Sequence, residues 1–211
     1  LVAHKVAPAL ACGASVLVKP APQTPLTSLL LEGVVRDAGA PPFAMQVVAC
    51  ANEVAESLVG SPVFRILSFT GSATVGWALK AKSGKKKVLL ELGGNAACLV
   101  HEDAGDLDAI VARIIPSAFG YAGQVCIKTQ RVYVHRPIAD AFVEKMHRAL
   151  IALKVADPNA EDTIVGPLID EKSAQRIESW VDEALASGHT KLVGGGRSGN
   201  RYEPTLLRMR G

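Results

Sequence analysis

The sequence alternates between short apolar runs and longer segments with helical periodicity, and this alternation constrains the fold more than any other feature. In the first half the apolar, β-branched runs lie at residues 14–18, 45–49, 63–69 and 87–90. Helical segments separate them, at residues 25–38, 52–60 and 73–82. Strands that alternate with helices of this length are typical of β-α-β units, so the sequence predicts an α/β fold with a parallel, doubly wound sheet.

Two of these helices carry start signals. Thr24 is a fitting N-cap with Pro25 at the first helical position, and Asn52 is expected to cap the next helix. Gly39 is expected to stop the first of them. The apolar residues of the helix at 25–38 recur at helical spacing and are Leu26, Leu29, Leu30, Val34 and Val35.

The second half continues with strands expected at residues 97–100 and 131–134 and helices at 106–121, 138–152 and 173–186. We place the boundary between two units at the pair Gly93-Gly94, which divides the chain into residues 1–93 and 94–211. Leu1 is not an initiator methionine, and the last residues follow directly on a strand-like stretch. Both units are therefore expected to be parts of larger domains.

Composition and charge exclude several classes of function. The formal net charge is +3, and Lys and Arg are spread out apart from Lys85-Lys86-Lys87, so no electrostatic footprint for nucleic acid is present. No apolar run approaches the roughly 20 residues that a membrane span needs, and no signal peptide opens the chain. We expect a cytoplasmic protein with no membrane partner.

Cysteine and histidine spacing gives no sign of a metal site. The cysteines are far apart and include no C-x-x-C pair, and the histidines show no ligand spacing with one another or with the cysteines. The sequence therefore predicts neither a disulfide framework nor a bound metal. The residues concerned are Cys12, Cys50, Cys98, Cys126, His4, His101, His135, His147 and His189.

Cys126 is the first candidate for chemistry. It follows a small, polar segment, Ala122-Gly123-Gln124, between a predicted helix and a predicted strand, whereas the other cysteines lie within apolar stretches. A thiolate nucleophile must be reachable and needs backbone donors nearby to stabilise an oxyanion. A small buried cysteine with no chemical role remains the alternative, since this segment offers no histidine partner.

Glu91 is the second candidate because it ends the apolar run Val88-Leu89-Leu90. A carboxylate at the end of a buried strand is desolvated, and desolvation makes it a stronger base, as a general base requires. An edge residue pointing into water is the alternative.

Two further segments could hold a nucleotide. Thr70-Gly71-Ser72 joins a predicted strand to a helix, and a helix N-terminus beside a glycine can bind phosphate. An ordinary Ser72 N-cap is the alternative, because no G-x-G-x-x-G motif is present. Lys19 follows the first predicted strand, where α/β sheets bind ligands, although a solvated surface lysine fits equally well.

Taken together, these segments resemble the aldehyde dehydrogenase superfamily over essentially the whole chain. Six phrases carry the resemblance in the family's order: Val18-Lys19-Pro20 with Gln23-Thr24-Pro25, Phe69-Thr70-Gly71-Ser72, Leu90-Glu91-Leu92-Gly93-Gly94-Asn95, Gly123-Gln124-Val125-Cys126, Val165-Gly166-Pro167 and Glu203-Pro204-Thr205. The resemblance implies that residues 1–93 are part of a Rossmann-like coenzyme-binding domain and 94–211 part of a catalytic domain. The chain would be a central fragment of a homo-oligomeric enzyme.

The resemblance also implies roles for single residues. Cys126 would be the nucleophile and Glu91 the base. Lys19 would hold the adenine ribose, Gly71 and Ser72 the pyrophosphate, and Leu92 and Gly93 would border the nicotinamide. The implied reaction oxidises an aldehyde to a carboxylic acid with NAD or NADP, through a thiohemiacetal and a thioester on the cysteine.

Three departures from the family's pattern matter. The chain lacks the upstream Pro-Trp-Asn-like phrase that supplies a second oxyanion donor, and it lacks the downstream Glu-Phe-Gly-Pro-like segment. Pro22 stands where NAD-preferring members commonly carry a glutamate that binds the ribose. A truncated or non-catalytic nucleotide-binding fragment is therefore the main alternative. A CoA-acylating member would use the same cysteine but would usually lack Glu91.

Overall fold

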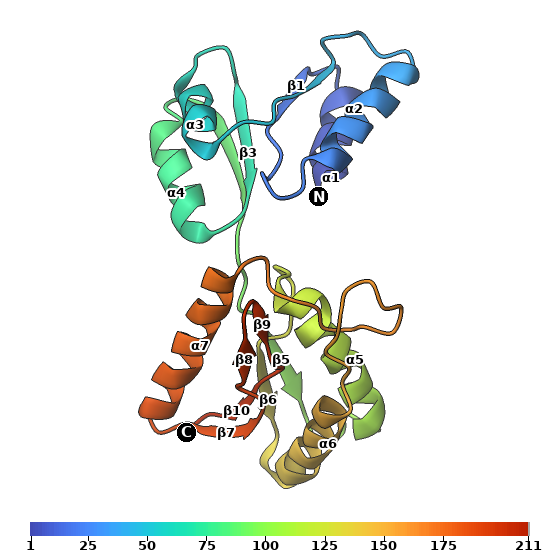
Figure 1. Cartoon of the computed structure of the whole chain (residues 1–211), viewed down its shortest axis with the longest axis vertical. Helices are drawn as coiled ribbons and strands as arrows, with labels where there is room; N and C mark the ends of the chain where they lie inside the picture. Colours follow the sequence, from blue (N-terminus) through green and yellow to red (C-terminus); the bar gives the residue numbers. More distant parts are fainter. Residues whose placement is uncertain (211) are drawn as a thin grey trace. The chain divides into compact units, whose positions relative to one another are not determined.

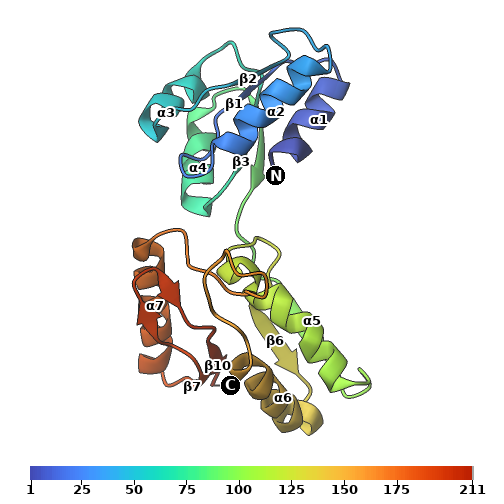
Figure 2. The same cartoon turned by 45° about the vertical axis from the view of Figure 1, so that its right-hand side comes forward.

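The computed structural model describes residues 1–210 of the chain. The chain divides into two compact units between Leu92 and Gly93. Both units combine helices and strands, and the two alternate throughout the first unit, as Figure 1 and Figure 2 show. The predicted α/β class is therefore observed.

The first unit contains four helices and four strands. In chain order they are α1 (Val2–Ala11), β1 (Val16–Val18), α2 (Leu26–Asp37), β2 (Met45–Val47), α3 (Asn52–Gly60), β3 (Ile66–Thr70), α4 (Ala73–Lys82) and β4 (Lys87–Glu91). β1 pairs with β2 and β3 pairs with β4, both in parallel. The predicted parallel pairing of strands is observed. Within the described residues, β1–β2 and β3–β4 form two separate two-stranded sheets rather than one continuous sheet.

Two predicted caps in this unit are wrong. The cap of α2 is Pro25 rather than Thr24, because the Pro25 carbonyl already accepts the amide of Leu29 at 3.2 Å. Ala51, in an extended conformation, caps α3, and Asn52 is its first helical residue. The Asn52 side chain instead accepts a hydrogen bond from Lys19 at 2.5 Å.

The apolar face of α2 is largely open in this unit. Leu26, Leu30 and Val34 are 71%, 73% and 62% exposed, and the only buried residue of the helix is Ser28. Helical spacing predicted the helix correctly. It did not predict how much of the helix is covered.

The second unit carries the rest of the chain. Its elements are β5 (Ala97–Val100), α5 (Leu107–Phe119), a 3-10 turn (Gly120–Gly123), β6 (Arg131–Val134), a second 3-10 turn (Arg136–Ile138), α6 (Ala139–Ile151), α7 (Glu171–Ala186), β7 (Thr190–Val193), β8 (Arg197–Ser198), β9 (Arg201–Tyr202) and β10 (Leu206–Arg208). β5 and β6 are parallel, whereas β7 with β10 and β8 with β9 are antiparallel.

The hydrophobic core of the second unit lies where α5 and α6 pack on β5 and β6, an arrangement visible in Figure 1. Its buried members are Val100, Val111, Ile114, Ile115, Phe142, Met146 and Leu150. A second cluster joins α7 to β9 through Leu168, Ala174, Val181 and Tyr202. The first core thus holds β5 and β6 in place, and the loop that contains Cys126 leads directly into β6.

None of the helices in residues 1–210 combines the length and the apolar character needed to cross a membrane.

Candidate active site

Cys126 is exposed, in a loop between α5 and β6. The residues before it have an unusual backbone: Tyr121, Ala122 and Gly123 all have positive φ, at 53°, 54° and 70°. For residues other than glycine this left-handed conformation costs free energy, on the order of 1 kcal/mol or more each. Such strain persists only where the surrounding structure holds it, and it is frequent at functional sites.

Hydrogen bonds hold this loop in place. The Gln124 side-chain amide donates to the Tyr121 carbonyl at 3.0 Å, and its oxygen accepts the backbone N–H of Ile169 at 3.0 Å. On the other side of the cysteine, the hydroxyls of Ser117 and Thr129 lie 2.8 Å apart. The loop is therefore fixed from both sides, while the thiol itself remains open.

Gly94 lies directly against the backbone of Cys126. A Cβ atom at Gly94 would be 2.6 Å from the Cys126 carbonyl oxygen, a distance that real Cβ contacts do not show. The next residue is fixed as well, since Arg131 donates to the carbonyl of Asn95 at 2.7 Å. Gly93 has open space around it. Within the second unit, Gly94 therefore packs against the cysteine loop, and Arg131 holds the neighbouring Asn95.

Glu91 is the last residue of β4, opposite Thr70 of β3. Its side chain is exposed rather than buried, so the desolvation expected at this strand end is not observed. Lys5 of α1 is charge-coupled to it: burial lowers the pKa of Lys5, and the carboxylate of Glu91 partly opposes that shift.

Backbone hydrogen bonds and close side-chain contacts fix the turn from β3 into α4. The Gly71 N–H donates to the Glu91 carbonyl at 3.0 Å, which extends the ladder, and a Cβ at Gly71 would meet the ring of Phe69 at 2.6 Å. Ser72 caps α4 by accepting the amide of Val75 at 3.4 Å, in agreement with the N-cap interpretation. Leu92 packs over this helix, 2.5 Å from where a Cβ of Gly76 would lie.

A hollow of about 290 Å³ opens after the carboxyl ends of β1 and β2. Its lining is small and apolar, and consists of Pro20, Ala21, Pro22, Pro25, Ala49, Cys50 and Ala51. Lys19 stands immediately before it in the chain and reaches across to Asn52. A larger hollow of about 350 Å³ lies between α5 and α6, around Asp108 and Lys145, and contains none of the predicted site residues.

Two further features of the first unit bear on the predicted nucleotide site. At the carboxyl end of β3 the Thr70 hydroxyl is buried and has no hydrogen-bond partner among the described residues. The N-terminus of α4 follows directly, with no acidic side chain in its first turn. A helix terminus and an apolar hollow thus follow strand ends in this unit, which is where α/β folds bind ligands, and nucleotide binding by these residues stays a prediction.

The predicted site residues fall into both units. Lys19, Pro22, Gly71, Ser72, Glu91 and Leu92 belong to the first, and Gly93 and Cys126 to the second. The pairing of Glu91 with Cys126 across the two units stays a prediction.

Sequence reasoning missed two features. Lys5 had no motif to mark it, and only its partial burial near Glu91 singles it out. The second is a pair of histidines that are far apart in the sequence: His101 and His135 are stacked, with ring centroids 4.7 Å apart. Both follow adjacent parallel strands, a relation that linear spacing does not reveal.

The chain belongs to the aldehyde dehydrogenase family, whose sequence model matches residues 1–209. It is 44% identical over 208 residues to the 3-sulfolactaldehyde dehydrogenase of Priestia megaterium, which covers 98% of this chain and 43% of that relative. The chain thus spans less than half the length of the curated relatives it matches.

Solved structures agree with this membership. Aldehyde dehydrogenase 21 of Physcomitrella patens, in complex with the reaction product succinate, is 44% identical with a TM-score of 0.93, over 98% of this chain and 43% of that one. Glyceraldehyde-3-phosphate dehydrogenase of Methanocaldococcus jannaschii, complexed with NADP, is 36% identical with a TM-score of 0.91, over 98% and 46%. The family resemblance and the α/β fold predicted from the sequence are confirmed, and the predicted choice of NAD or NADP agrees with these relatives.

Proposed function

We propose that the protein carrying this sequence oxidises an aldehyde to a carboxylic acid with NAD+ or NADP+, and that Cys126 is its nucleophile. The observation that supports this most is the exposed thiol of Cys126 in a strained, hydrogen-bonded loop of an aldehyde dehydrogenase chain. A reachable thiol on a fixed backbone is what covalent attack on a carbonyl carbon needs.

In the first half of the proposed reaction the Cys126 thiolate attacks the aldehyde carbon, and a C–S bond forms. Charge develops on the aldehyde oxygen. The backbone N–H of Cys126 makes no hydrogen bond within residues 1–210, so it can donate to that oxygen. When bound, NAD+ or NADP+ would supply a hydride acceptor, and the thiohemiacetal on Cys126 would then become a thioester.

In the second half water attacks the thioester, and Glu91 takes the proton of that water. The C–S bond then breaks, which releases the carboxylic acid and returns the thiolate. Lys5 lies close enough to Glu91 for their charges to interact. A base of this kind contributes about 10²–10⁴-fold to the rate of the step it assists.

Two variants of the complete protein test these roles. Cys126→Ala should abolish both dehydrogenase and esterase activity, because both reactions need the same thiolate. Cys12→Ala is the matched control, since Cys12 is also exposed, and it should keep full activity. Loss of activity on alkylation of Cys12, Cys50 or Cys98 would contradict the assignment.

Glu91→Gln should separate the two halves of the reaction. The initial burst of NAD(P)H should persist, while steady turnover falls by about 10²-fold or more, because only hydrolysis of the thioester needs the base. An unchanged steady rate would remove Glu91 from the mechanism. A protein that binds NADP+ without any turnover would instead support the non-catalytic nucleotide-binding alternative.

A further inference from the structure

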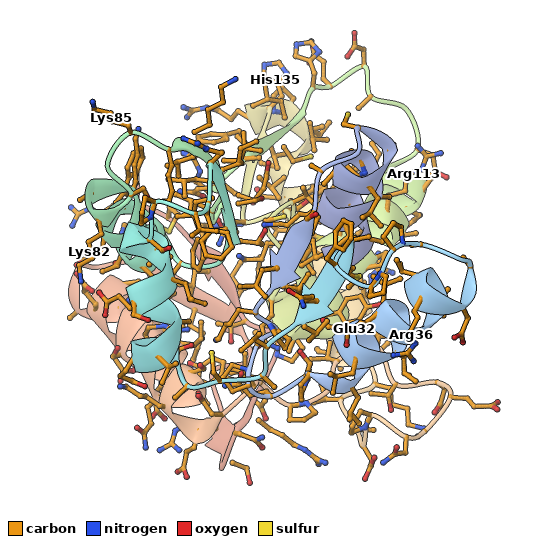
Figure 3. All side chains as sticks on the ribbon, turned by 90° about the horizontal axis from the view of Figure 1, so that it is seen from above. Glu32, Arg36, Lys82, Lys85, Arg113 and His135 are labelled. Carbon is orange, nitrogen blue, oxygen red and sulfur yellow. The ribbon has the colours of Figure 1, made fainter. Side chains whose placement is uncertain are left out.

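His101 and His135 lie side by side because of the register of two strands. Val100, the last residue of β5, pairs with Val134, the last residue of β6. The next residues are the two histidines, and the backbone N–H of His135 donates to the Val100 carbonyl at 2.8 Å. Their rings are stacked with 6° between the planes, and both are exposed. Figure 3 shows His135 pointing outward from the end of its strand.

Glu102 completes a set of three possible ligands. One oxygen of its carboxylate is 3.4 Å from Nδ1 of His135. Two ligand atoms about 2.0–2.1 Å from a tetrahedral Zn²⁺ lie about 3.3 Å from each other, so this pair is already at a suitable separation. One ligand atom from each of His101, Glu102 and His135 lies within 4.8 Å of the others. The two rings are stacked at 6°, so binding one ion requires them to rotate out of the stack until a nitrogen of each points at the same position as the Glu102 carboxylate.

Asp103 adds the outer support that metal-binding histidines usually have. Its carboxylate is 2.8 Å from Nδ1 of His101, which leaves Nε2 of that ring for a ligand. A carboxylate in this position fixes the ring orientation and makes the other nitrogen a better ligand.

We propose that His101, Glu102 and His135 form a binding site for a divalent transition-metal ion of the zinc type, with a fourth position open to water. Two imidazoles and one carboxylate favour Zn²⁺ over Mg²⁺ or Ca²⁺, which prefer sets of oxygen ligands. The site replaces the sequence-based expectation of no metal. It follows β6, whereas Cys126 precedes that strand, so the ion is distinct from the thiol chemistry. Its effect is to tie the ends of β5 and β6 together.

The test uses isothermal titration of the complete protein with ZnCl₂, after all accessible cysteines have been alkylated with iodoacetamide. Alkylation matters because Cys12 and Cys126 are exposed thiols that bind zinc themselves. We expect one ion per chain. The double variant His101→Asn with His135→Asn should weaken binding by at least about 100-fold, and Asp103→Asn by about tenfold.

His4→Asn serves as the matched control, because His4 is an exposed histidine of α1 outside the cluster. It should leave zinc affinity unchanged. Zinc should also raise the melting temperature of the wild type but not that of the double variant, because an ion that binds only the folded strands stabilises them. Three results would each overturn the proposal: no zinc binding by the alkylated wild type, equal affinity in the double variant, or equal loss with His4→Asn.

Discussion

Gly94→Ala tests whether the backbone beneath Cys126 controls its chemistry. The new Cβ would lie 2.6 Å from the Cys126 carbonyl oxygen, whereas ordinary contacts begin at 3.4 Å, so the two must separate by 3.4 − 2.6 = 0.8 Å. The obstacle is backbone rather than a flexible side chain, and the loop is held by Gln124 and by the Ser117–Thr129 contact. The strain therefore falls on the backbone of Gly94 and of Cys126, and any shift of the second moves the nucleophile itself.

The expected effect follows from that distance. A misplacement of about 1 Å at a reacting group can cost about 10²-fold in rate. We expect kcat/KM of Gly94→Ala to fall by roughly 10- to 100-fold, and the rate of Cys126 alkylation by iodoacetamide to change with it. Aldehyde oxidation followed at 340 nm and mass spectrometry of the alkylated peptide measure the two.

Gly120→Ala is the control for this substitution. Gly120 lies at the end of α5, in the same loop region, has open space around its Cα, and does not have positive φ. Its activity should stay within about twofold of wild type. If Gly94→Ala matched that control in both kcat/KM and alkylation rate, the argument that Gly94 positions Cys126 would be wrong.

Two further predictions concern the first unit. Pro22 is exposed at the edge of its hollow and offers no carboxylate to repel a 2′-phosphate. We therefore expect the complete enzyme to use NADP+ at least comparably with NAD+, and Pro22→Glu to shift its preference towards NAD+. A wild-type preference for NAD+ of roughly 100-fold in catalytic efficiency, about 2.7 kcal/mol, would refute this. Burial lowers the pKa of Lys5 below its ordinary 10.5, so the unfolded chain holds the proton more tightly and the charged form destabilises the fold at neutral pH. Lys5→Met should therefore raise the urea midpoint at pH 7, with a gain that shrinks as pH rises towards 10.5; a gain independent of pH would contradict the burial of a charge.

Elements with strong local signals were predicted closely. The helix at 73–82 and the strands at 97–100 and 131–134 have the predicted bounds, because each has its own turn residues and apolar pattern. The strand expected at 63–69 is shorter at its start, since β3 begins only at Ile66, where pairing with Lys87 of β4 begins. The Asn52 cap was also misplaced, and the Asn52 side chain instead accepts a hydrogen bond from Lys19, a residue 33 positions earlier that local sequence does not bring near it.

The candidate site divides in the same way between local and long-range information. Cys126 could be singled out as a candidate from its neighbours alone, because a small, polar loop between a helix and a strand is a local pattern, and its role as the nucleophile stays a prediction. The strained backbone of Tyr121 and Ala122 could not be predicted, since neither residue type favours positive φ and the contacts of Gln124 with Tyr121 and Ile169 help to hold the turn.

The histidine cluster depends wholly on register. His101 and His135 are 34 positions apart, and they meet because β5 and β6 are parallel with Val100 opposite Val134. A shift of one residue in that register would turn the alternate faces of β6, so Val132 and Val134 would leave the core that they share with Cys98 and Val100. The burial of these apolar side chains therefore fixes the separation of the two imidazoles. Any metal affinity at the strand ends is then a consequence of core packing, and a core substitution that altered the register would remove the site without touching its ligands.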